Sequence, residues 1–533
     1  MIDLLVIGAG GAGLSAALAA KEAGASVLVI GKTSPTSAQT SMAQGGINAA
    51  LGNAGEDRLT MHIEDTIASA HGLCNTDMVR KMCQGAPEAI TWLERLGVPF
   101  SRIDTVQKSP TASVAQRRLG GASAKRACYA QDYTGLKILH TLYDNCLKAH
   151  IEILDNRYLL NLVTEEGIAK GATFLNIHTG EIEQINAKSL VLATGGYGSL
   201  YHGFTTNAYG SSGDGISAVL RAGGAVSDME FVQFHPTALR ESSILISESA
   251  RGEGGYLVNG EGERFIDELK PRDEVARAIF RELADGKEVF LDVRHLGEAK
   301  LMALLPQEIA LCKLHAGVDP VRSLIPVKPV AHYSMGGIDV DEVLEVNGIK
   351  GCFAAGECSN AKVHGANRLG GNSLLEIIVF GRVAGENACQ YALRASSKPA
   401  EKTQLQKDTK YIAEIYRRTN RINFYETRRR LGELFYEKVG IVRENRSLQQ
   451  ALDEVISMQL ALSETGIADK AKQHNQNLVE FLEFTNALLL APTVISSALA
   501  RDESRGAHFK RGFEQEDEAF KKHMVLRWKE ENR

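Results

Sequence analysis

A short apolar run that ends in a glycine-rich turn is the feature that most constrains how this chain can fold. Residues 2–7 (IDLLVI) are apolar, residues 8–13 read Gly-Ala-Gly-Gly-Ala-Gly, and an alanine-rich stretch with helical spacing follows to Ala23. A second apolar run, 26–30, begins directly afterwards. A strand, a tight turn, a helix and another strand within thirty residues predict a βαβ unit with a parallel sheet.

The glycines of this turn have the spacing of a dinucleotide-binding fingerprint. Gly8 permits the tight turn, Gly10 lets the backbone approach a pyrophosphate, and Gly13 lets the helix pack closely on the strand. The helix N-terminus then offers N–H groups and a positive dipole to phosphate. The second strand ends in Gly31-Lys32 rather than in the acidic residue that often holds a ribose. This departure favours FAD over NAD as the bound dinucleotide.

Three further glycine turns lie far along the chain, and two of them follow predicted strands. The strand 189–193 runs into Thr194-Gly195-Gly196, and the strand 352–355 runs into Gly356-Glu357. The third turn is Ser212-Gly213-Asp214-Gly215. Each turn presents backbone N–H groups or a carboxylate suited to the ribityl and ribose hydroxyls of FAD. The cofactor contacts expected here are Thr194, Gly195, Asp214 and Glu357.

One nucleotide-binding sheet that uses all of these turns must be assembled from separate parts of the chain. The 533 residues exceed what one hydrophobic core usually organises, and from about residue 403 the pattern becomes charged and helical, its last helix expected at 476–490. We expect an α/β fold with a discontinuous Rossmann-like FAD-binding domain, an inserted α+β capping domain and a C-terminal helical domain. The predicted boundaries are 1–227 and 332–394 for the FAD-binding domain, 228–331 for the capping domain and 405–533 for the helical domain.

Charge and hydropathy exclude several classes of function. The formal net charge is −5 and basic residues are interspersed with acidic ones, so no nucleic-acid partner is expected. We expect no apolar run of the roughly 18 to 20 residues that span a bilayer, and a strand at residue 2 leaves no room for a cleavable leader. The last twenty residues are highly charged and are expected to form a solvated or partner-contacting tail. The predicted location is the cytoplasm, at most peripherally on the cytoplasmic face of the inner membrane.

The eight cysteines are scattered without a Cys-x-x-Cys pair. This pattern predicts reduced, mostly buried thiols. No iron–sulfur or other metal ligand set is recognisable in the sequence. Electrons that leave a flavin in this chain must therefore pass to another protein or to a diffusible acceptor.

Four longer strings are similar to those of a known family: AQGGI at 43–47, QFHPT at 233–237, RGEGGY at 251–256 and HGANRLGGNS at 364–373. They resemble the flavoprotein subunits of succinate dehydrogenase and fumarate reductase, and their relative L-aspartate oxidase. The match runs in order to ESRGAH at 503–508, so it covers essentially the whole chain. The other expected cofactor contacts are Lys32, Thr40, Gln44, Gly45, Gly46 and Ser373.

The resemblance implies a site for a C4 dicarboxylate. Two negative charges need fixed cations and hydrogen-bond donors in a water-poor cleft. By resemblance, His235, His332 and Arg368 hold the two carboxylates, and Ser247 adds a hydroxyl.

A proton-transfer set is also implied by the resemblance. Arg272 matches the family's proton-transferring arginine, and Glu248 with Arg251 matches the relay that reprotonates it. Arginine is a poor acid in water, so this role requires a desolvated, positively charged pocket.

Two other charged features are read as structural. Asp273 and Arg277 lie four apart on a predicted helix and should form an ion pair. The run 428–430 (RRR) cannot share one helical face and is assigned to solvent or to an acidic partner.

Gln39 stands where many members of membrane complexes carry a histidine bonded covalently to the flavin, seven residues before Gly46. An amide cannot form that bond, so the sequence predicts noncovalent FAD. Within the family this favours fumarate reduction or an oxidase role over succinate oxidation.

L-aspartate oxidase, which forms iminoaspartate in NAD biosynthesis, is the alternative. It too holds FAD noncovalently, and the strings at 234–239 and 271–273 fit it equally well. The strings at 119–123, 127–130 and 367–372 resemble the dehydrogenase and reductase side. We therefore favour hydride transfer between flavin N5 and succinate or fumarate, with electrons relayed to an iron–sulfur partner in a membrane-associated complex. A third hypothesis is a flavin-binding scaffold subunit, against which the intact set of cationic groups argues.

Overall fold

A seven-stranded sheet forms the centre of the computed structural model, which describes residues 1–103, 113–395 and 398–528. Its order is β6-β2-β1-β9-β8-β7, with β16 also paired to β9. The strands β6, β2, β1, β9 and β16 are parallel neighbours, whereas β7 and β8 extend the sheet antiparallel from β9. The strand bounds are β1 (Ile2–Ile7), β2 (Val27–Ile30), β6 (Glu152–Leu154), β7 (Arg157–Glu165), β8 (Ile168–Asn176), β9 (Ile182–Leu192) and β16 (Cys352–Ala354).

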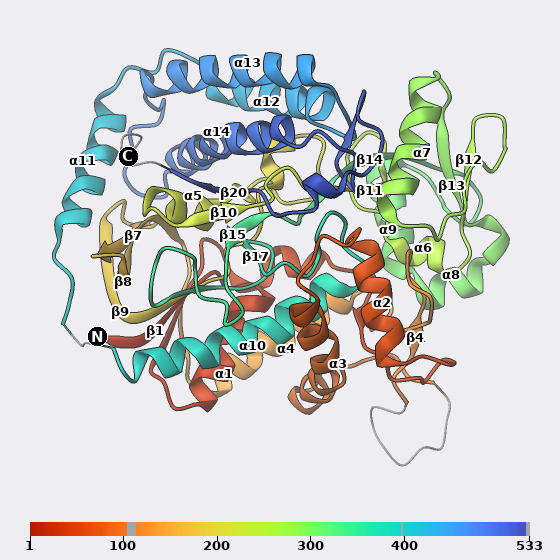
Figure 1. The fold of residues 1–533 in the computed structure, drawn as a ribbon, viewed down its shortest axis with the longest axis horizontal. Coiled ribbons are helices and arrows are strands. Elements are labelled where there is room, and N and C mark those ends of the chain that lie inside the picture. The colour runs from red at the N-terminus through yellow and green to blue at the C-terminus, as the bar shows by residue number, and fades with distance from the viewer. Residues whose placement is uncertain (104–112, 396–397, 529–533) are drawn as a thin grey trace.

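The three predicted strand-to-glycine junctions lie on adjacent strands of this sheet. β1 pairs with β9, and β9 pairs with β16, all in parallel. Their carboxyl ends therefore meet at one edge, where a doubly wound sheet binds its ligand. Helices α1 (Gly11–Glu22) and α10 (Asn372–Ala392) pack against each other beside the sheet, close to α4 (Thr134–Lys148) (Figure 1).

A separate lobe interrupts the sheet-forming sequence, and we call residues 232–334 the inserted lobe (Figure 1). Its own four-stranded sheet has the order β11-β14-β13-β12. A second hydrophobic cluster, which includes Leu257, Val275 and Leu291, fills it. Its elements are β11 (Val232–Leu239), α6 (Glu248–Gly252), β12 (Tyr256–Asn259), α7 (Arg272–Ala284), β13 (Val289–Asp292), α8 (Glu298–Leu304), α9 (Pro306–Ala316) and β14 (Ile325–Ser334).

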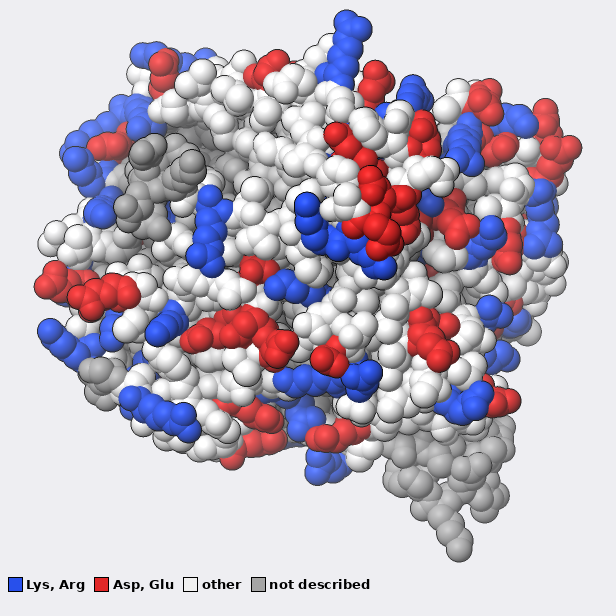
Figure 2. Space-filling view, viewed as in Figure 1, with Lys and Arg blue, Asp and Glu red and all other residues white. Residues whose placement is uncertain are grey.

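The remaining elements connect these units. Short strands form two small sheets and one isolated pair. Acidic and basic side chains are interspersed over the face drawn in Figure 2. The bounds are β3 (Ile47–Asn48), α2 (Leu59–Ser69), α3 (Thr76–Leu96), β4 (Gln116–Arg117), β5 (Ala127–Cys128), α5 (Asp214–Arg221), β10 (Ala225–Ser227), β15 (Gly337–Asp339), β17 (Ser359–Asn360), β18 (Val442–Arg443), β19 (Phe509–Lys510) and β20 (Val525–Arg527).

Three helices, α12 (Phe424–Lys438), α13 (Asn445–Ser463) and α14 (Gln476–Ala500), lie above the sheet in Figure 1, and α11 (Thr403–Arg417) runs beside its β7 and β8 strands. The predicted end of the last helix at residue 490 is wrong, because α14 continues through Pro492. Proline cannot donate to the carbonyl four residues earlier, but the Gln459 side chain from α13 donates to that oxygen, on Leu488, at 2.7 Å. A neighbouring helix therefore satisfies the acceptor that the proline leaves open.

The expectation that no apolar run is long enough to span a membrane is also corrected by α14. This helix has 25 residues and is long and apolar enough to cross a membrane, by length and composition alone. In its most apolar part, 72% of the helix is buried inside the protein. Buried core helices have the same length and composition, so α14 is weak evidence for a membrane span.

The charged C-terminal segment is packed against the protein rather than solvated throughout. β20 pairs antiparallel with β10, and the His523 Nδ1 lies 2.6 Å from the Asp228 carboxylate. Most side chains of residues 514–528 are nevertheless exposed, as expected for a solvated segment, so the structure corrects only the expectation of a free tail. The last five residues lie outside the described part.

Candidate active site

A cavity of about 540 Å³ opens at the carboxyl ends of β1, β9 and β16 and reaches the inserted lobe. Its size falls in the range of cofactor and substrate pockets. The structure brings all of the predicted cofactor and substrate residues to its wall except Gly13, and adds two of the three predicted proton-transfer residues, Glu248 and Arg272. Arg251 lies just behind the wall, with its Nη2 3.4 Å from the Glu248 carboxylate.

The glycine turn is built as the sequence predicts. Gly8 has a φ of +115°, a conformation that side chains rarely adopt. A Cβ at Gly13 would stand 1.9 Å from the Gly8 carbonyl oxygen, so α1 touches the turn at this point. The Thr40 hydroxyl accepts the N–H of Gly11, the first residue of α1, at 3.1 Å. Gly13 thus serves helix packing, while Gly8 and Gly10 face the cavity.

Lys32 is held by three oxygens at the far end of the cavity. Its Nζ donates to the Gly210 carbonyl at 2.6 Å, to Asp214 at 2.8 Å and to Glu483 at 2.7 Å. Burial opposes the charge, but the two carboxylates outweigh it and hold the pKa of Lys32 above its usual range. Glu483 lies on α14, so an ion pair fastens the C-terminal helices to the nucleotide end of the cavity.

The arginine run at 428–430 divides between interior and surface. Arg428 is buried and donates to the Tyr209 carbonyl at 2.6 Å, on the loop that lines the cavity. Arg429 and Arg430 are exposed and pair with Glu433 and Glu454. The solvent assignment is therefore wrong for Arg428, whereas the predicted Asp273–Arg277 ion pair is present at 2.6 Å.

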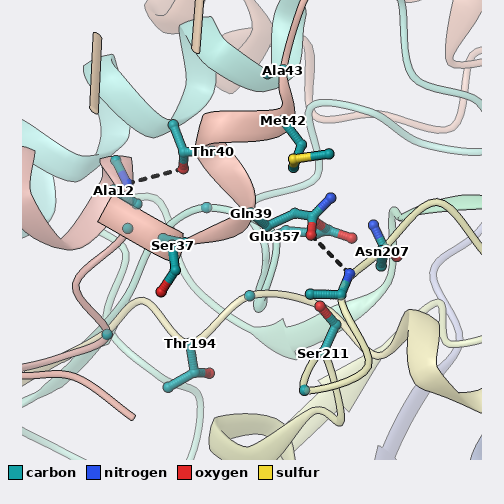
Figure 3. Close-up of a pocket in the computed structure, with 18 of the residues that line it drawn as sticks. Ala12, Ser37, Gln39, Thr40, Met42, Ala43, Thr194, Asn207, Ser211 and Glu357 are labelled. Atoms are coloured by element: carbon teal, nitrogen blue, oxygen red, sulfur yellow. Dashed lines mark hydrogen bonds between the residues drawn. The ribbon is translucent and has the colours of Figure 1, made fainter. Parts of the chain in front are cut away.

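The middle of the cavity has features that fit a flavin. Gln44 is 2% exposed, and its Oε1 has no hydrogen-bond partner among the described residues. Gln39 extends toward the loop that carries Asn207, and its Oε1 accepts the Ala208 N–H at 2.9 Å (Figure 3). Burial raises the pKa of Glu357 to about 7. A buried amide, a carboxyl group and glycine-rich backbone offer the donors and acceptors that a flavin ring and its ribityl chain require.

The end of the cavity between the inserted lobe and the loop before α10 carries a cluster of cationic groups. Arg272 is the first residue of α7, and Arg368 lies on the loop before α10. One acceptor joins them: the Gln233 Oε1 lies 3.0 Å from the Arg272 Nη1 and 3.1 Å from the Arg368 Nη2. The Gln233 Nε2 donates to Asn367 Oδ1 and to the Arg368 carbonyl, which fixes the amide.

Arg272 forms its closest ion pair with Glu248. The Arg272 Nε and Nη2 donate to one Glu248 oxygen at 3.1 and 2.6 Å, and the Gly120 N–H donates to the other at 3.1 Å. Burial acts to raise the pKa of Glu248, but Arg272 and Arg251 outweigh it and hold the pKa below its usual range. A Cβ at Gly120 or at Gly370 would lie 2.5 Å from this carboxylate. Two Leu-Gly-Gly strings thus leave room for one buried anion.

His235 and His332 lie beside the arginines, with ring centroids 4.9 Å apart. Burial, followed by the charge of Arg272, holds the pKa of both imidazoles well below its usual range. The Nδ1 of His332 lies 2.7 Å from the Thr206 hydroxyl. If that hydroxyl donates, the neutral ring carries its proton on Nε2. Burial also lowers the pKa of Arg368 to about 10, and its guanidinium stacks 4.3 Å from the Tyr333 ring centroid.

Sequence reasoning missed two residues of this site. Gln233 lies two positions before His235 on β11, and the two-residue period of a strand could have indicated that both face the same way. Glu483 had no comparable local signal, because it lies 451 residues from its partner Lys32.

Comparisons with known proteins agree with this site. Residues 3–374 match the family described as FAD binding domain, and residues 428–533 match the family described as fumarate reductase flavoprotein C-term. The fumarate reductase flavoprotein subunit of Escherichia coli is 38% identical over 95% of this chain and 88% of its own length. The succinate dehydrogenase flavoprotein subunit of Rickettsia bellii is 37% identical over 98% of this chain and 92% of its own. A solved mutant of the E. coli quinol fumarate reductase has a TM-score of 0.93 and 36% identity, over 99% of this chain and 95% of that one.

The glycine turns, the flavin-sized cavity and the family match define the class as an FAD-dependent oxidoreductase. Within that class, the chain belongs to the family of fumarate reductase and succinate dehydrogenase flavoprotein subunits. These relatives favour the dehydrogenase and reductase prediction over L-aspartate oxidase.

Proposed function

We propose that this chain interconverts succinate and fumarate as the flavoprotein subunit of a larger enzyme, with FAD bound noncovalently. The observation that carries the proposal is the cluster of Arg272, Arg368, His235 and His332 at one end of the FAD cavity, in which the first three residues are buried and His332 is half-buried. Among the residues that the structure describes, only the Glu248 carboxylate forms an ion pair with this cluster. The cluster therefore has an excess of positive charge, which a dianion can neutralise when its two carboxylates accept from these donors.

The bound FAD supplies hydride acceptance or donation at its N5 atom. In this proposal His235, His332 and Arg368 hold the two carboxylates, and the Ser247 hydroxyl adds a fourth donor. Donors that are fixed before the reaction stabilise charge that develops on a carboxylate as hydride moves. The glycines that line the cavity, together with the Gln44 Oε1 that has no hydrogen-bond partner among the described residues, would hold the cofactor beside these donors.

Arg272 moves the proton in this proposal. Arg272 is 7% exposed and lines the cavity beside the proposed substrate site. Glu248 contacts Arg272 at 2.6 Å, and Arg251 stands on the other side of Glu248 at 3.4 Å. This order gives a three-residue route by which a proton lost from Arg272 is replaced.

The wider assignments rest on the same proposal. We infer that the inserted lobe, residues 232–334, acts as the capping domain that the sequence predicts at 228–331. Several relatives are named as subunits, and a similar solved structure is titled quinol-fumarate reductase with menaquinol molecules. We therefore infer an iron–sulfur partner that receives or supplies electrons, and attachment of the assembly to the cytoplasmic face of a membrane.

Acid precipitation of the purified chain is expected to release all of its FAD into the supernatant. Gln39 is an amide and its Oε1 is already bonded to the Ala208 N–H, so it offers no nucleophile for a covalent link. The check is the flavin absorbance of supernatant and pellet, together with in-gel fluorescence after denaturation. A pellet that stays yellow contradicts noncovalent binding.

Succinate, and not L-aspartate, is expected to bleach the flavin of the isolated chain under anaerobic conditions. The reduced flavin should then be reoxidised by fumarate. The measurement is the flavin absorbance after each addition. Rapid bleaching by L-aspartate, with iminoaspartate and peroxide formed on admission of air, would overturn the proposed function in favour of the oxidase.

A further inference from the structure

Two buried carboxyl groups join the inserted lobe to the rest of the protein behind the active site. Asp132, between β5 and α4, is fully buried, and Glu308, in the first turn of α9, is 4% exposed. One oxygen of Asp132 accepts the N–H groups of Gln307 and Glu308 at 2.8 and 3.1 Å. The residue that precedes α9, Leu305, offers no side-chain cap. Asp132 thus supplies, from outside the inserted lobe, the cap that α9 lacks.

Glu308 passes this connection on to the active site. Its Oε1 accepts the Ser247 N–H at 3.0 Å. Ser247 lines the cavity, and its hydroxyl accepts the Ser249 N–H at 3.1 Å at the start of α6. Glu248 is the next residue of that turn and the ion-pair partner of Arg272. An unbroken series of contacts therefore runs from Asp132 to the carboxylate that contacts Arg272.

We propose that Glu308 is a positioning residue of the active site, which with Asp132 fastens the inserted lobe and holds the Ser247–Glu248 turn at the cavity wall. The inference rests on the proposed function, because it concerns the residues assigned there to substrate and proton. A neutral carboxyl suits this place. Its carbonyl oxygen accepts the Ser247 N–H without adding a second anion behind a site that must hold two carboxylates.

The surroundings of Glu308 favour that neutral form. The groups that face it are Asp132, Arg117 on β4 and Cys312 on α9 itself. Arg117 forms no ion pair with Glu308: it stacks 3.6 Å from the Tyr129 ring centroid, donates to the Gln131 carbonyl and lies 3.8 Å from the Glu253 carboxylate. Its charge acts to lower the pKa of Glu308 but is outweighed. Burial, and then the Asp132 carboxylate, raise the pKa of Glu308 to about 8. The Glu308 Oε2 has no hydrogen-bond partner among the described residues.

Because Glu308 is protonated in the folded protein, its contribution to stability should decrease as the pH rises. Between its ordinary pKa of 4.5 and about 8, Glu308 keeps in the folded protein a proton that the unfolded chain has released. The stabilisation by this proton is complete below pH 4.5 and is lost as the pH rises toward 8. Above pH 8 two adjacent buried carboxylates repel, so the turn loosens and turnover should fall.

Glu308→Ala in the FAD-loaded chain is expected to lower kcat/KM for succinate and fumarate about 10-fold or more, because the Ser247 N–H is left without its acceptor. Glu308→Gln, which keeps an acceptor oxygen, should retain most activity at pH 7. It should also lose the alkaline limb of the pH profile, which is the fall in turnover expected above about pH 8. Leu314→Ala, at a position of α9 that is 77% exposed, is the matched control. FAD content and the flavin spectral change on fumarate binding are measured for every variant.

Loss of the alkaline limb in Glu308→Gln with wild-type FAD content supports the proposal. Wild-type kcat/KM in Glu308→Ala, or an unchanged limb in Glu308→Gln, overturns it. A wild-type chain that turns over neither dicarboxylate refutes the proposed function and this inference together. An active wild type matched by Glu308→Ala refutes the inference alone.

Discussion

Replacing Arg272 with glutamine is expected to lower kcat for succinate oxidation and fumarate reduction by about 10²- to 10⁴-fold, the usual range for loss of a positioned proton-transfer group. A glutamine amide neither carries the positive charge nor exchanges a proton at this position. The loss should fall on kcat more than on dicarboxylate binding, because His235, His332 and Arg368 remain in the cavity.

The same substitution removes the main partner of Glu248. Of its contacts in the described part of the chain, the Glu248 carboxylate would keep the Gly120 N–H at 3.1 Å and Arg251 at 3.4 Å. Breaking a buried ion pair from one side costs about 3 to 5 kcal/mol, so a fall in melting temperature is expected too. Folding and chemistry are separated by measuring FAD per chain and the affinity for fumarate from the flavin spectrum.

Anaerobic rapid-mixing measurements of flavin reduction by succinate check the result for Arg272→Gln. The matched control is Arg281→Gln, since Arg281 lies on the same helix and is exposed. A kcat within 10-fold of the wild-type value, in a variant that binds FAD fully, would show that Arg272 does not carry the proton.

Gly13→Ala is expected to give a chain that binds almost no FAD. The added methyl carbon would stand 1.9 Å from the Gly8 carbonyl oxygen and 3.3 Å from the Ala193 Cβ. The Gly8 backbone cannot move away, because it is packed against the end of β9: a Cβ at Gly8 would stand 2.1 Å from the Ala193 carbonyl oxygen. The clash must therefore push α1 away from β1, and the N–H groups that the helix offers to the pyrophosphate move with it.

The measurement is the ratio of flavin to protein after purification and after incubation with excess FAD. Gly260→Ala is the control, because a Cβ there has no neighbour closer than 3.7 Å. It should be as yellow as the wild type. Full FAD content in Gly13→Ala would mean that close contact between helix and strand is not needed at this turn.

The arginine run and the last strand show two features that spacing along the chain could not predict. The run at 428–430 presents three arginines that spacing alone assigns to different helix faces. Only packing decides that Arg428 faces the Tyr209 loop while its neighbours pair at the surface. The C-terminal residues 525–527 have no strand pattern, and β20 exists because β10 offers it an edge.

The length of α14 follows the same logic. Neither Pro492 nor the uncharged stretch 484–500 indicates where the helix ends. The side chain of Gln459 on α13 provides the donor that allows the helix to continue.

The sequence by itself determined the βαβ start, the FAD turn, the parallel sheet, the helical C-terminal part and the family. These features depend on residues a few positions apart, and strand, helix and turn each have a period or a glycine requirement that spacing reveals. Only the tertiary structure decided that Gln233 joins two arginines, that Glu483 fastens Lys32, and that Asp132 caps α9 beside Glu308. The last two contacts join residues 451 and 176 positions apart. No local period encodes such a pairing, because it depends on how an inserted lobe and a distant helix close over the same cavity.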